Sequence, residues 1–351
     1  VYPYRSIWRA IRDRKSLEWK VWEGFDENYL RQTFSDFQSY NLDFSRHRPN
    51  TRLNYFKKNN FDILLPCISP PSPRYTLPWV GYLYDFQHKY LPAFFTESQM
   101  TNRDKAFARM LLQAGHVVVN AKAVKSDAEK FVADINAKIH VLPFSPSPRL
   151  EWLNEVRDLK HQYGIKKPYF IICNQFWIHK DHTTAFKGFA ELLRTVGKNY
   201  ELVCTGSTTD ARFPDYFDAL LSLIEQLKIK NDVKILGHIS KLDQIALLKS
   251  SIAVIQPTLF EGGPGGGASY DAISLGKPLI VSDIPVNQEI DTDSRVFFFE
   301  AKNAMSLAEK MRKVISIDFN KPTDEELYLR GLQRKKACGE VLLDVIKQAV
   351  N

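Results

Sequence analysis

The sequence predicts an α/β protein made of two doubly wound domains. Its 351 residues leave room for two domains of ordinary size, and a hydrophobic content of 44% is enough to give each domain a core. Short apolar segments bounded by Pro and Gly alternate along the chain with segments of helical periodicity, which is typical of parallel sheets covered by helices. No uninterrupted apolar stretch approaches the roughly 18 residues that span a bilayer, so we expect no transmembrane helix.

The first half of the chain has the pattern of a small parallel sheet. The expected strands cover 61–67, 79–84, 115–120 and 139–143, and a helix is expected over 101–113. The Pro- and Ser-rich segment 144–148 suits a linker, because it cannot continue a sheet. We therefore predict that a first domain covers 1–148.

The second half repeats the alternation with clearer periods. The expected strands cover 169–173, 201–204, 233–236, 252–256 and 278–281. The expected helices cover 183–195, 213–227, 242–249, 270–275 and 305–315. These elements predict a doubly wound second domain over 149–322, followed by a helix over 323–351 that packs back across the first domain. Because ligands of such sheets bind at the carboxyl ends of the strands, the candidate loops follow Cys173, Cys204, Gln256 and Val281.

A glycine-rich loop after the strand that ends at Gln256 is the most informative segment. It holds five glycines between 262 and 267 and lies directly before a predicted helix. Such a loop lets the backbone approach an anion closely, and the helix N-terminus adds N–H donors, so a diphosphate would fit there. The segment is not a Walker loop, because Pro278 follows Gly276 and Lys277 where Ser or Thr would be needed. A plain turn is the alternative, but it would not need the flanking carboxylates of Glu261 and Asp271.

The segment from Phe260 to Pro278 resembles the signature of the retaining nucleotide-sugar glycosyltransferases of family 4, which have the two-domain GT-B architecture. The resemblance covers 167–310 well and 79–145 more loosely. It implies that Glu261 binds hydroxyls of the donor sugar and that Asp271 binds the ribose. Two departures leave the donor open: the second carboxylate is Asp where Glu is usual, and the loop is two residues longer. The donor-binding residues implied by the resemblance are Gln175, Gly206, Gly265, Gly266, Gly267, Ala268, Ser269 and Asp271.

The segment 174–182 resembles the family's second donor-binding segment. Lys180 matches a Lys that binds the donor phosphates in the family, whereas Gln175 occupies the position where the family has an Arg. With Lys180 and a helix N-terminus at the diphosphate, the leaving group can be stabilised without a metal, and no cofactor is expected. His179 and His182 are interpreted as solvated or phosphate-facing, since no third ligand is near. Asp291 and Asp293 look like a metal-binding Asp-x-Asp, which we reject in favour of a surface turn.

The first domain supplies weaker candidates for the acceptor side of the cleft. The segment 81–95 resembles a strand-end segment of the family, with Tyr84 where a His is frequent. Asp85 and His88 are expected to face the cleft as catalytic candidates beside Lys180 and Glu261, although Asp85 is at least as well suited to capping its own loop. Asn120 and Lys122 follow a cleft-facing strand and are candidates for acceptor or donor contacts. Compared with the family, the opening strand and glycine-rich loop are absent, so the start of the domain is expected to be incomplete or diverged.

The charge balance favours a polyanionic neighbour. The chain has 48 Lys and Arg against 40 Asp and Glu, which gives a net charge of +8. Basic and aromatic residues interleave between Tyr4 and Trp22, which suits either packing on the protein itself or peripheral contact with an anionic membrane. Nucleic acid is not expected as a partner, because no recognised nucleic-acid motif occurs. Four cysteines without a CxxC pair indicate a reducing compartment, so we expect a cytoplasmic protein. Peripheral association with the inner face of the membrane is the alternative location.

These observations predict a glycosyltransferase that moves a sugar from a nucleotide-diphosphate sugar to a glycan or lipid-linked acceptor. Retention at the anomeric carbon and a role in surface polysaccharide or glycoconjugate synthesis follow from the resemblance alone. The alternative is a nucleotide or polyanion binding module without turnover, which the net charge, Gln175 and Tyr84 favour. Turnover of a nucleotide sugar distinguishes the two.

Overall fold

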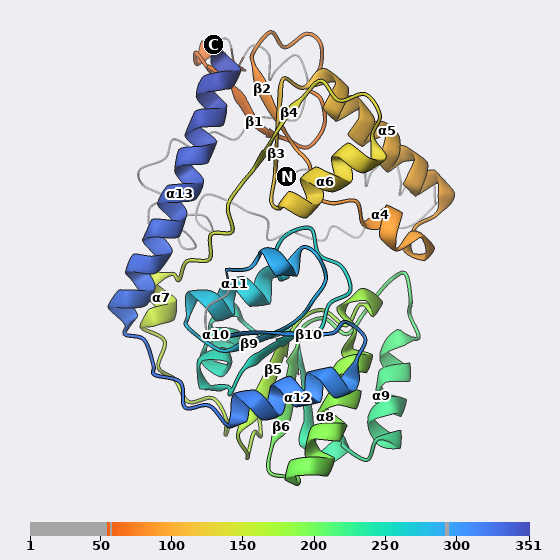
Figure 1. Ribbon diagram of the computed structural model, residues 1–351, viewed down its shortest axis with the longest axis vertical. Helices are drawn as coiled ribbons and strands as arrows, with labels where there is room; N and C mark the ends of the chain where they lie inside the picture. The colour runs from red at the N-terminus through yellow and green to blue at the C-terminus, as the bar shows by residue number, and fades with distance from the viewer. Residues whose placement is uncertain (1–54, 57, 292–294) are drawn as a thin grey trace, which may run out of the picture. The chain divides into compact units, whose positions relative to one another are not determined.

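The computed structural model describes residues 55, 56, 58–291 and 295–351. Every helix and strand considered below lies in the compact unit Phe61–Asn351 (Figure 1). The segment 4–22 and Asp293 lie outside the described residues. The domain boundaries at 148 and 322 stay predictions.

Within the described residues, four parallel strands form a first sheet in the order β1-β2-β3-β4. The strands are β1 (Leu64–Cys67), β2 (Trp79–Tyr82), β3 (His116–Val119) and β4 (Lys138–Val141). The helices of this part are α4 (Gln87–Tyr90), η2 (Pro92–Phe94), α5 (Glu97–Gln113) and α6 (Lys122–Phe131). All four strands lie within the predicted ranges, except that β4 begins one residue earlier than expected.

Six parallel strands of the described residues form a second sheet in the order β10-β9-β8-β5-β6-β7. The strands are β5 (Tyr169–Cys173), β6 (Glu201–Thr205), β7 (Val233–Gly237), β8 (Val254–Gln256), β9 (Leu279–Ser282) and β10 (Val296–Phe299). The helices are α7 (Leu150–Leu153), η3 (Ile178–Lys180), α8 (His182–Val196), α9 (Tyr216–Gln226), η4 (Lys230–Asp232), α10 (Lys241–Ser250), α11 (Gly266–Ser274), η5 (Asn287–Glu289), α12 (Ala304–Ile315) and α13 (Asp324–Val350). The strand order reverses between β5 and β8, so their carboxyl ends flank the point where such sheets bind ligands.

Helix boundaries differ from the predicted ones where caps or tertiary contacts decide them. Helix α5 begins at Glu97 and not at 101, because Thr96 and Gln99 form a capping box. Helix α11 begins at Gly266, within the glycine run, although glycine disfavours helix interiors. Helix α6 and strand β10 were not predicted.

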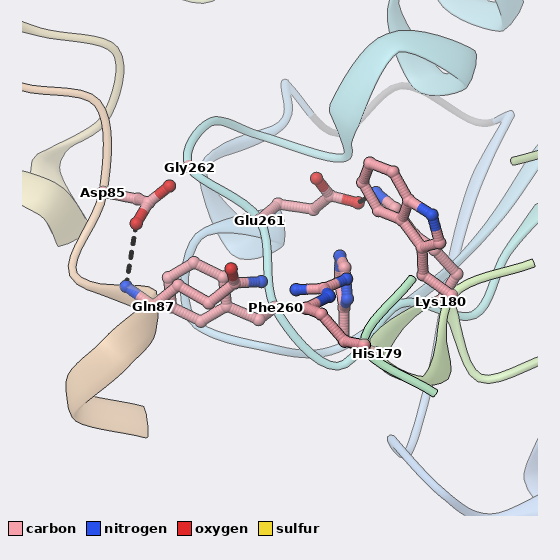
Figure 2. A pocket seen from close by; sticks show the side chains of 9 residues that line it. Asp85, Gln87, His179, Lys180, Phe260, Glu261 and Gly262 are labelled. Atoms are coloured by element: carbon pink, nitrogen blue, oxygen red, sulfur yellow. Dashed lines mark hydrogen bonds and ion pairs between the residues drawn. The ribbon is translucent and has the colours of Figure 1, made fainter. Parts of the chain in front are cut away.

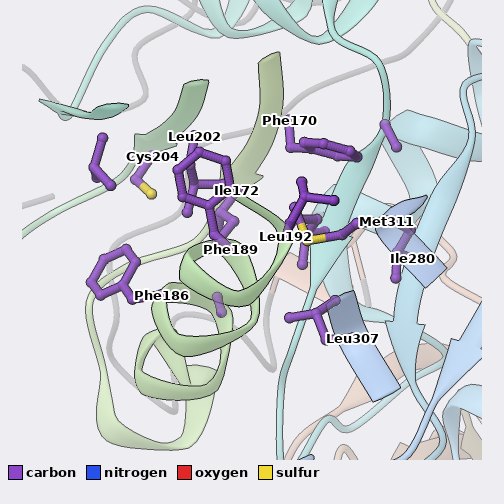
Figure 3. Close-up of a cluster of buried hydrophobic side chains, with 14 of the residues drawn as sticks. Phe170, Ile172, Phe186, Phe189, Leu192, Leu202, Cys204, Ile280, Leu307 and Met311 are labelled. Atoms are coloured by element: carbon purple, nitrogen blue, oxygen red, sulfur yellow. The ribbon is translucent and has the colours of Figure 1, made fainter. Parts of the chain in front are cut away.

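Alternate residues of β5 enter two hydrophobic cores, one on each face of the second sheet. Phe170 and Ile172 pack with Phe186 and Phe189 of α8, as Figure 3 shows. Ile171 packs on the opposite face with residues of α10 and α11. Because successive side chains of a strand point to opposite faces, this alternation holds helices on both sides of the sheet. The same packing fixes the loop that follows β5.

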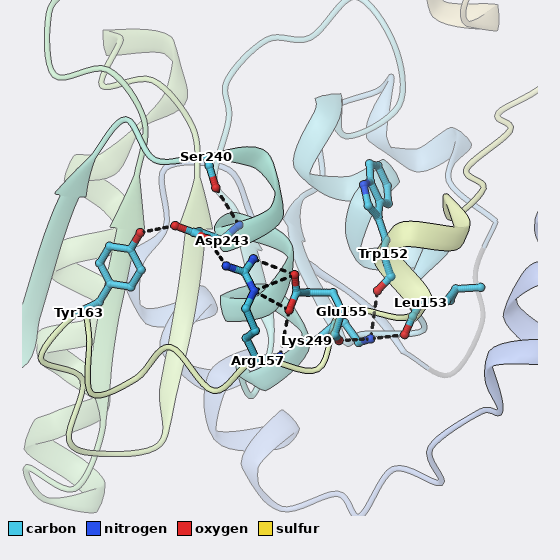
Figure 4. Close-up of polar contacts among 8 residues, drawn as sticks. All are labelled: Trp152, Leu153, Glu155, Arg157, Tyr163, Ser240, Asp243 and Lys249. Atoms are coloured by element: carbon cyan, nitrogen blue, oxygen red, sulfur yellow. Dashed lines mark hydrogen bonds and ion pairs between the residues drawn. The ribbon is translucent and has the colours of Figure 1, made fainter. Parts of the chain in front are cut away.

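The segment that leads into β5 is anchored on α10 (Figure 4). The Lys249 ammonium donates to the carbonyls of Trp152 and Leu153 at 3.0 and 2.7 Å. Arg157 pairs with Asp243 at 3.0 Å, and Asp243 also accepts a hydrogen bond from the Tyr163 hydroxyl at 2.7 Å. These contacts fasten residues 152–163, which follow the predicted linker, to the second sheet.

Helix α13 packs back on the first sheet, as the sequence predicted. Val345 is fully buried against Val80 of β2 and Val118 of β3. The Lys138 ammonium of β4 donates to the Gln348 side chain at 2.8 Å. The last helix of the chain therefore contributes to the core beside the first sheet.

The N-terminus of α6 is capped by a residue distant in sequence. Ala121 stands at the N-cap position and offers no side-chain acceptor. Instead, the two carboxylate oxygens of Glu289 accept hydrogen bonds from the backbone N–H groups of Lys122 and Ala123, each at 2.7 Å. A carboxylate at this position also interacts favourably with the helix dipole. Glu289 therefore joins a loop of the second sheet to a helix beside the first.

We expect Glu289→Ala to lower the free energy of unfolding by about 1 kcal/mol, the usual value of a helix N-cap. Chemical denaturation measures the change. Glu309→Ala is the control, because Glu309 is exposed on α12 and caps no helix. Equal midpoints for the two variants would show that the interaction contributes nothing to stability.

Candidate active site

A cavity of about 200 Å³ lies at loops that follow strands of both sheets (Figure 2). Two loops come after β2 and β5, and two more come after β6 and β8. This is the position that the sequence predicted from the carboxyl ends of the strands. The lining residues are Asp85, Gln87, Trp177, His179, Lys180, Arg212, Phe260, Glu261 and Gly262.

Lys180 and Glu261 form an ion pair in the wall of this cavity. The ammonium lies 2.5 Å from the Glu261 carboxylate, and the two side chains are only 10% and 12% exposed. The same carboxylate oxygen accepts a hydrogen bond from the Gln256 amide at 3.1 Å, and Gln256 in turn accepts one from Asn174 at 2.7 Å. The two residues that the sequence matched to separate donor-binding segments therefore meet. Asn174 and Gln256, which hold them, were not predicted as site residues.

Gly262 is needed where the loop passes the first sheet. A Cβ at Gly262 would lie 2.5 Å from the Tyr84 carbonyl oxygen, and one at Gly263 would lie 3.4 Å from the Asn120 Cβ. A larger residue at 262 would push the loop away from the backbone of residues 84 and 85. Close approach between two protein loops therefore explains Gly262, which the sequence had linked to phosphate binding.

The remaining glycines form the start of α11 beside Glu261. Gly265 and Gly266 have φ values of +66° and +65°, which favour glycine. A Cβ at Gly266 would meet the Glu261 carboxyl group at 2.9 Å, so the carboxylate lies close to this helix end. The space beside Gly267 is open. Because the first N–H groups of a helix have no partner within it, Gly267 and Ala268 are placed to offer donors.

Two predicted donor-binding residues have polar groups that are already engaged. The Gly265 N–H donates to the Asn287 side chain at 2.8 Å, and the Ser269 hydroxyl donates to the Gly265 carbonyl at 2.8 Å. Ser269 is fully buried. These hydrogen bonds hold the loop in shape, so the donors for a phosphate would come from the residues between them.

Asp271 is buried on α11 and paired with a lysine. Its carboxylate lies 2.5 Å from the Lys241 ammonium. Burial raises the pKa of Asp271, while the Lys241 charge opposes that increase. Asp271 does not line the cavity described above, and its predicted contact with the ribose stays a prediction.

Gln175 and Gly206 lie side by side at the ends of β5 and β6. A Cβ at Gly206 would lie 2.1 Å from the Asn174 carbonyl oxygen, and its φ of +136° also favours glycine. The close approach predicted at Gly206 is therefore to the protein backbone. Gln175 is exposed and does not line the cavity.

The expectation of solvated or phosphate-facing histidines is wrong for His182, whereas for His179 only the solvated alternative is contradicted. His182 is fully buried at the start of α8 and stacks on Phe176 with ring centroids 4.2 Å apart. His179 is also buried, although it lines the cavity. Burial lowers the pKa of each ring to about 3. Both side chains are therefore neutral near pH 7, because burial disfavours the charged form.

Of the two catalytic candidates from the first domain, only Asp85 lines the cavity. Its carboxylate accepts a hydrogen bond from the Gln87 N–H at 2.8 Å and pairs with Arg103 at 2.6 Å, so it also caps its own loop. His88 is buried behind the loop, where its ring contacts Asp104 at 2.8 Å and Arg103 at 3.2 Å. The expectation that His88 faces the cleft is wrong, because the hydrogen bonds and aromatic neighbours of its ring lie inside the first domain.

The other first-domain candidates do not line the cavity. Tyr84 packs its ring under Arg103 at 5.0 Å. The Asn120 amide donates to the Tyr82 hydroxyl. Lys122 has an exposed side chain, and its backbone is held by Glu289. Their predicted contacts with substrates stay predictions.

Sequence reasoning missed four residues that line the cavity: Gln87, Trp177, Arg212 and Phe260. Trp177 lies within a segment that the sequence did single out, and Phe260 precedes Glu261 directly. Arg212 lies beyond Cys204, after which the sequence placed a candidate loop, so its position after β6 was the available signal.

A family comparison identifies the part of the chain that carries most of this site. Residues 156–329 match the family described as glycosyl transferases group 1. The matched residues include Lys180, Glu261 and the glycine loop, so the match confirms the predicted resemblance. The assignment to family 4 and the retention of configuration at the anomeric carbon stay predictions.

One curated protein and two solved structures are similar to this chain. The chain is 23% identical over 231 residues to the O-antigen chain mannosyltransferase RfbU of Salmonella typhimurium, which covers 64% of this chain and 59% of that protein. The match therefore spans less than two thirds of the curated relative. A glycosyltransferase from Rickettsia africae has a TM-score of 0.63, 18% identity, and coverage of 89% of this chain and 85% of its own. Anabaena HepE, solved in complex with UDP and glucose, has a TM-score of 0.56, 16% identity, and coverage of 78% and 70%.

These likenesses and the two parallel sheets confirm the predicted GT-B fold. Among the residues that the structure describes, no three His, Cys, Asp or Glu side chains gather in a group that could hold a metal ion. No described helix combines the length and apolar character needed to cross a membrane.

Proposed function

We propose that this protein moves a sugar from a nucleotide-diphosphate sugar to a glycan or lipid-linked acceptor, in surface polysaccharide or glycoconjugate synthesis. The observation that carries the proposal is the Lys180–Glu261 pair beside the N-terminus of α11, in a cavity between loops of both sheets. The family of residues 156–329 supports it. Two similar proteins also support the proposal. RfbU is named as an O-antigen chain mannosyltransferase, and a structure of HepE is a complex with UDP-glucose.

The proposed reaction retains the configuration at the anomeric carbon. The bond from that carbon to the diphosphate oxygen breaks, and a bond to the acceptor oxygen forms on the same face. The proton of the acceptor hydroxyl passes to the departing diphosphate, so no protein nucleophile is used. Lys180 and the N–H groups of Gly267 and Ala268 stabilise the growing charge of the diphosphate, while Glu261 accepts hydrogen bonds from sugar hydroxyls.

Two further roles complete the proposal. Asp271, on α11, binds the ribose. Its carboxylate then contacts both the Lys241 ammonium and the ribose. Asp85 contacts the acceptor, because it lines the cavity on the side of the first sheet. His88 has no part in the reaction, since its ring is engaged inside the first domain.

Turnover of a nucleotide sugar tests the proposed function. The protein is incubated with UDP-, GDP-, ADP- and dTDP-sugars and a membrane or glycan extract, and release of the nucleoside diphosphate is measured. We expect release from at least one donor that depends on the extract. Binding of a donor without any release would favour the alternative, a nucleotide-binding module without turnover.

We expect transfer to need no divalent metal, because Lys180 and the start of α11 supply positive charge at the diphosphate. Activity in EDTA should stay within about twofold of activity in Mg²⁺, since electrostatic stabilisation then comes from the protein. A complete loss in EDTA with rescue by Mn²⁺ would contradict this and return attention to Asp291.

The protein is proposed to act in the cytoplasm, in peripheral contact with the inner face of the membrane, where a lipid-linked acceptor is presented. The net charge of +8 and the basic, aromatic segment 4–22 support this contact. Each basic residue near an anionic surface contributes about 1 kcal/mol.

We therefore expect sedimentation with vesicles that contain anionic lipid, and loss of binding as salt approaches about 0.5 M, where screening is strong. Phosphatidylcholine vesicles are the control. Replacing Arg5, Arg9, Arg12 and Arg14 by Gln should reduce the binding without changing turnover of a short soluble acceptor. Absence of binding at low salt would point to a soluble acceptor.

A further inference from the structure

Arg212 is a cation of the cavity that the proposed mechanism does not use. It lines the cavity together with Lys180, but it comes from a different loop, the one after β6. Its guanidinium makes two hydrogen bonds to the Asp210 carboxylate, from Nε at 3.1 Å and from Nη2 at 3.3 Å. The Asp210 side chain is only 4% exposed, so this pair fixes the plane of the guanidinium.

Two aromatic rings further restrict the guanidinium. Its central carbon lies 5.3 Å from the centroid of Trp177 and 5.5 Å from that of Phe94. Such stacking positions an arginine without using its N–H donors. Within the described part of the chain the Nη1 group makes no hydrogen bond, so it is left as a donor for a ligand.

The position of Trp177 explains why the two cations share one cavity. Trp177 lies three residues before Lys180, in the turn that follows β5, and its ring contacts Arg212. The neutral rings of His179 and Trp177 also line the cavity and add no charge. A ligand in this cavity therefore meets a lysine from one loop and an oriented arginine from the next.

We propose that Arg212 binds the diphosphate of the donor together with Lys180. The inference rests on the proposed function, because it takes a nucleotide-diphosphate sugar as the substrate. A diphosphate carries at least two negative charges on adjacent phosphoryl groups, which suits two cations from separate loops. The planar guanidinium, held by Asp210, presents its remaining N–H groups to phosphate oxygens.

Binding of nucleotides to two Arg212 variants tests the assignment. Arg212→Gln removes the charge, and Asp210→Asn with Arg212→Gln removes both charges, so that no buried carboxylate is left unpaired. Arg194→Gln is the matched control, because Arg194 makes the same two-nitrogen contact to Glu191 on the exposed side of α8. The probes are UDP, GDP and inorganic pyrophosphate, with uridine and guanosine as phosphate-free references. Calorimetry in EDTA gives the dissociation constants, and thermal melting without ligand checks the fold.

We expect both Arg212 variants to bind the diphosphate that the unmodified protein prefers about 10-fold to 100-fold more weakly, since a charge-assisted contact is lost. Binding of the matching nucleoside should change less than about threefold, because the nucleoside lacks the phosphates that Arg212 contacts. The Arg194 control should bind like the unmodified protein.

Two results would overturn the assignment. The first is unchanged diphosphate affinity in a folded variant, and the second is an equal loss of affinity for the nucleoside. If the first result comes with a raised KM for the acceptor, Arg212 belongs to the acceptor side. If the unmodified protein transfers sugar in these cases, only the role of Arg212 fails. If it binds no diphosphate and turns over no nucleotide sugar, the proposed function fails as well.

Discussion

Replacing Lys180 by alanine is expected to lower the rate of sugar transfer by about 100-fold or more, because the ammonium stabilises charge that develops on the departing diphosphate. The effect should fall mainly on kcat, since that charge grows between the ground state and the transition state. Steady-state kinetics on the donor found in the turnover assay measure kcat and KM separately. Thermal melting checks that the fold is intact.

A second lysine of the same domain provides the control. Lys167 pairs with Asp232 at 2.6 Å, but it lies before β5, at the opposite end of the strand from Lys180. Lys167→Ala should lower stability at most and leave kcat unchanged. Near-normal turnover of Lys180→Ala, with an unchanged melting temperature, would remove Lys180 from the active site.

Replacing Glu261 by glutamine or alanine is also expected to lower transfer by about 100-fold or more, because hydrogen bonds to a mostly buried carboxylate are strong. Glutamine keeps the shape of the side chain but removes the charge that pairs with Lys180 at 2.5 Å. The loss should therefore appear in Glu261→Gln as well as in Glu261→Ala. Initial rates at saturating donor measure it.

A double-mutant cycle separates the pair from its two members. Because Lys180 and Glu261 are in contact, their effects on transfer should not add, and the double variant should be little slower than either single variant. The Lys167 and Asp232 pair gives the matched cycle, which should show coupling in stability but none in transfer. Additive effects of Lys180 and Glu261 on kcat would mean that the two residues act independently.

Local patterns in the sequence predicted every described strand except β10, and they predicted the edge of the sheets where the site lies. The apolar segments at 169–173 and 201–204 are bounded by polar and turn residues, so each predicts a buried parallel strand without knowledge of its neighbours. Since parallel strands carry their ligand sites at their carboxyl ends, the loops with Lys180 and Glu261 followed directly.

The sequence could not predict contacts that join distant segments. Glu289 caps α6 across more than 160 residues, and Gly262 is small because the Tyr84 carbonyl lies beside it. His88 carries a polar side chain that suits a cleft. Its ring instead forms hydrogen bonds with Asp104 and Arg103 of α5, inside the first domain. None of these partners is marked by spacing or periodicity.

The sequence by itself therefore determined the two α/β parts, their parallel strands and the glycine loop, because hydrophobic periodicity and glycine content act within a few residues of the chain. Only the tertiary structure decided which polar groups face the cavity and which are engaged elsewhere. A buried polar group must find a partner wherever the fold brings one within hydrogen-bond distance, and that distance is set by packing between segments far apart in sequence. Such distant contacts explain why Arg212 lines the cavity and why His88 is held away from it by Asp104.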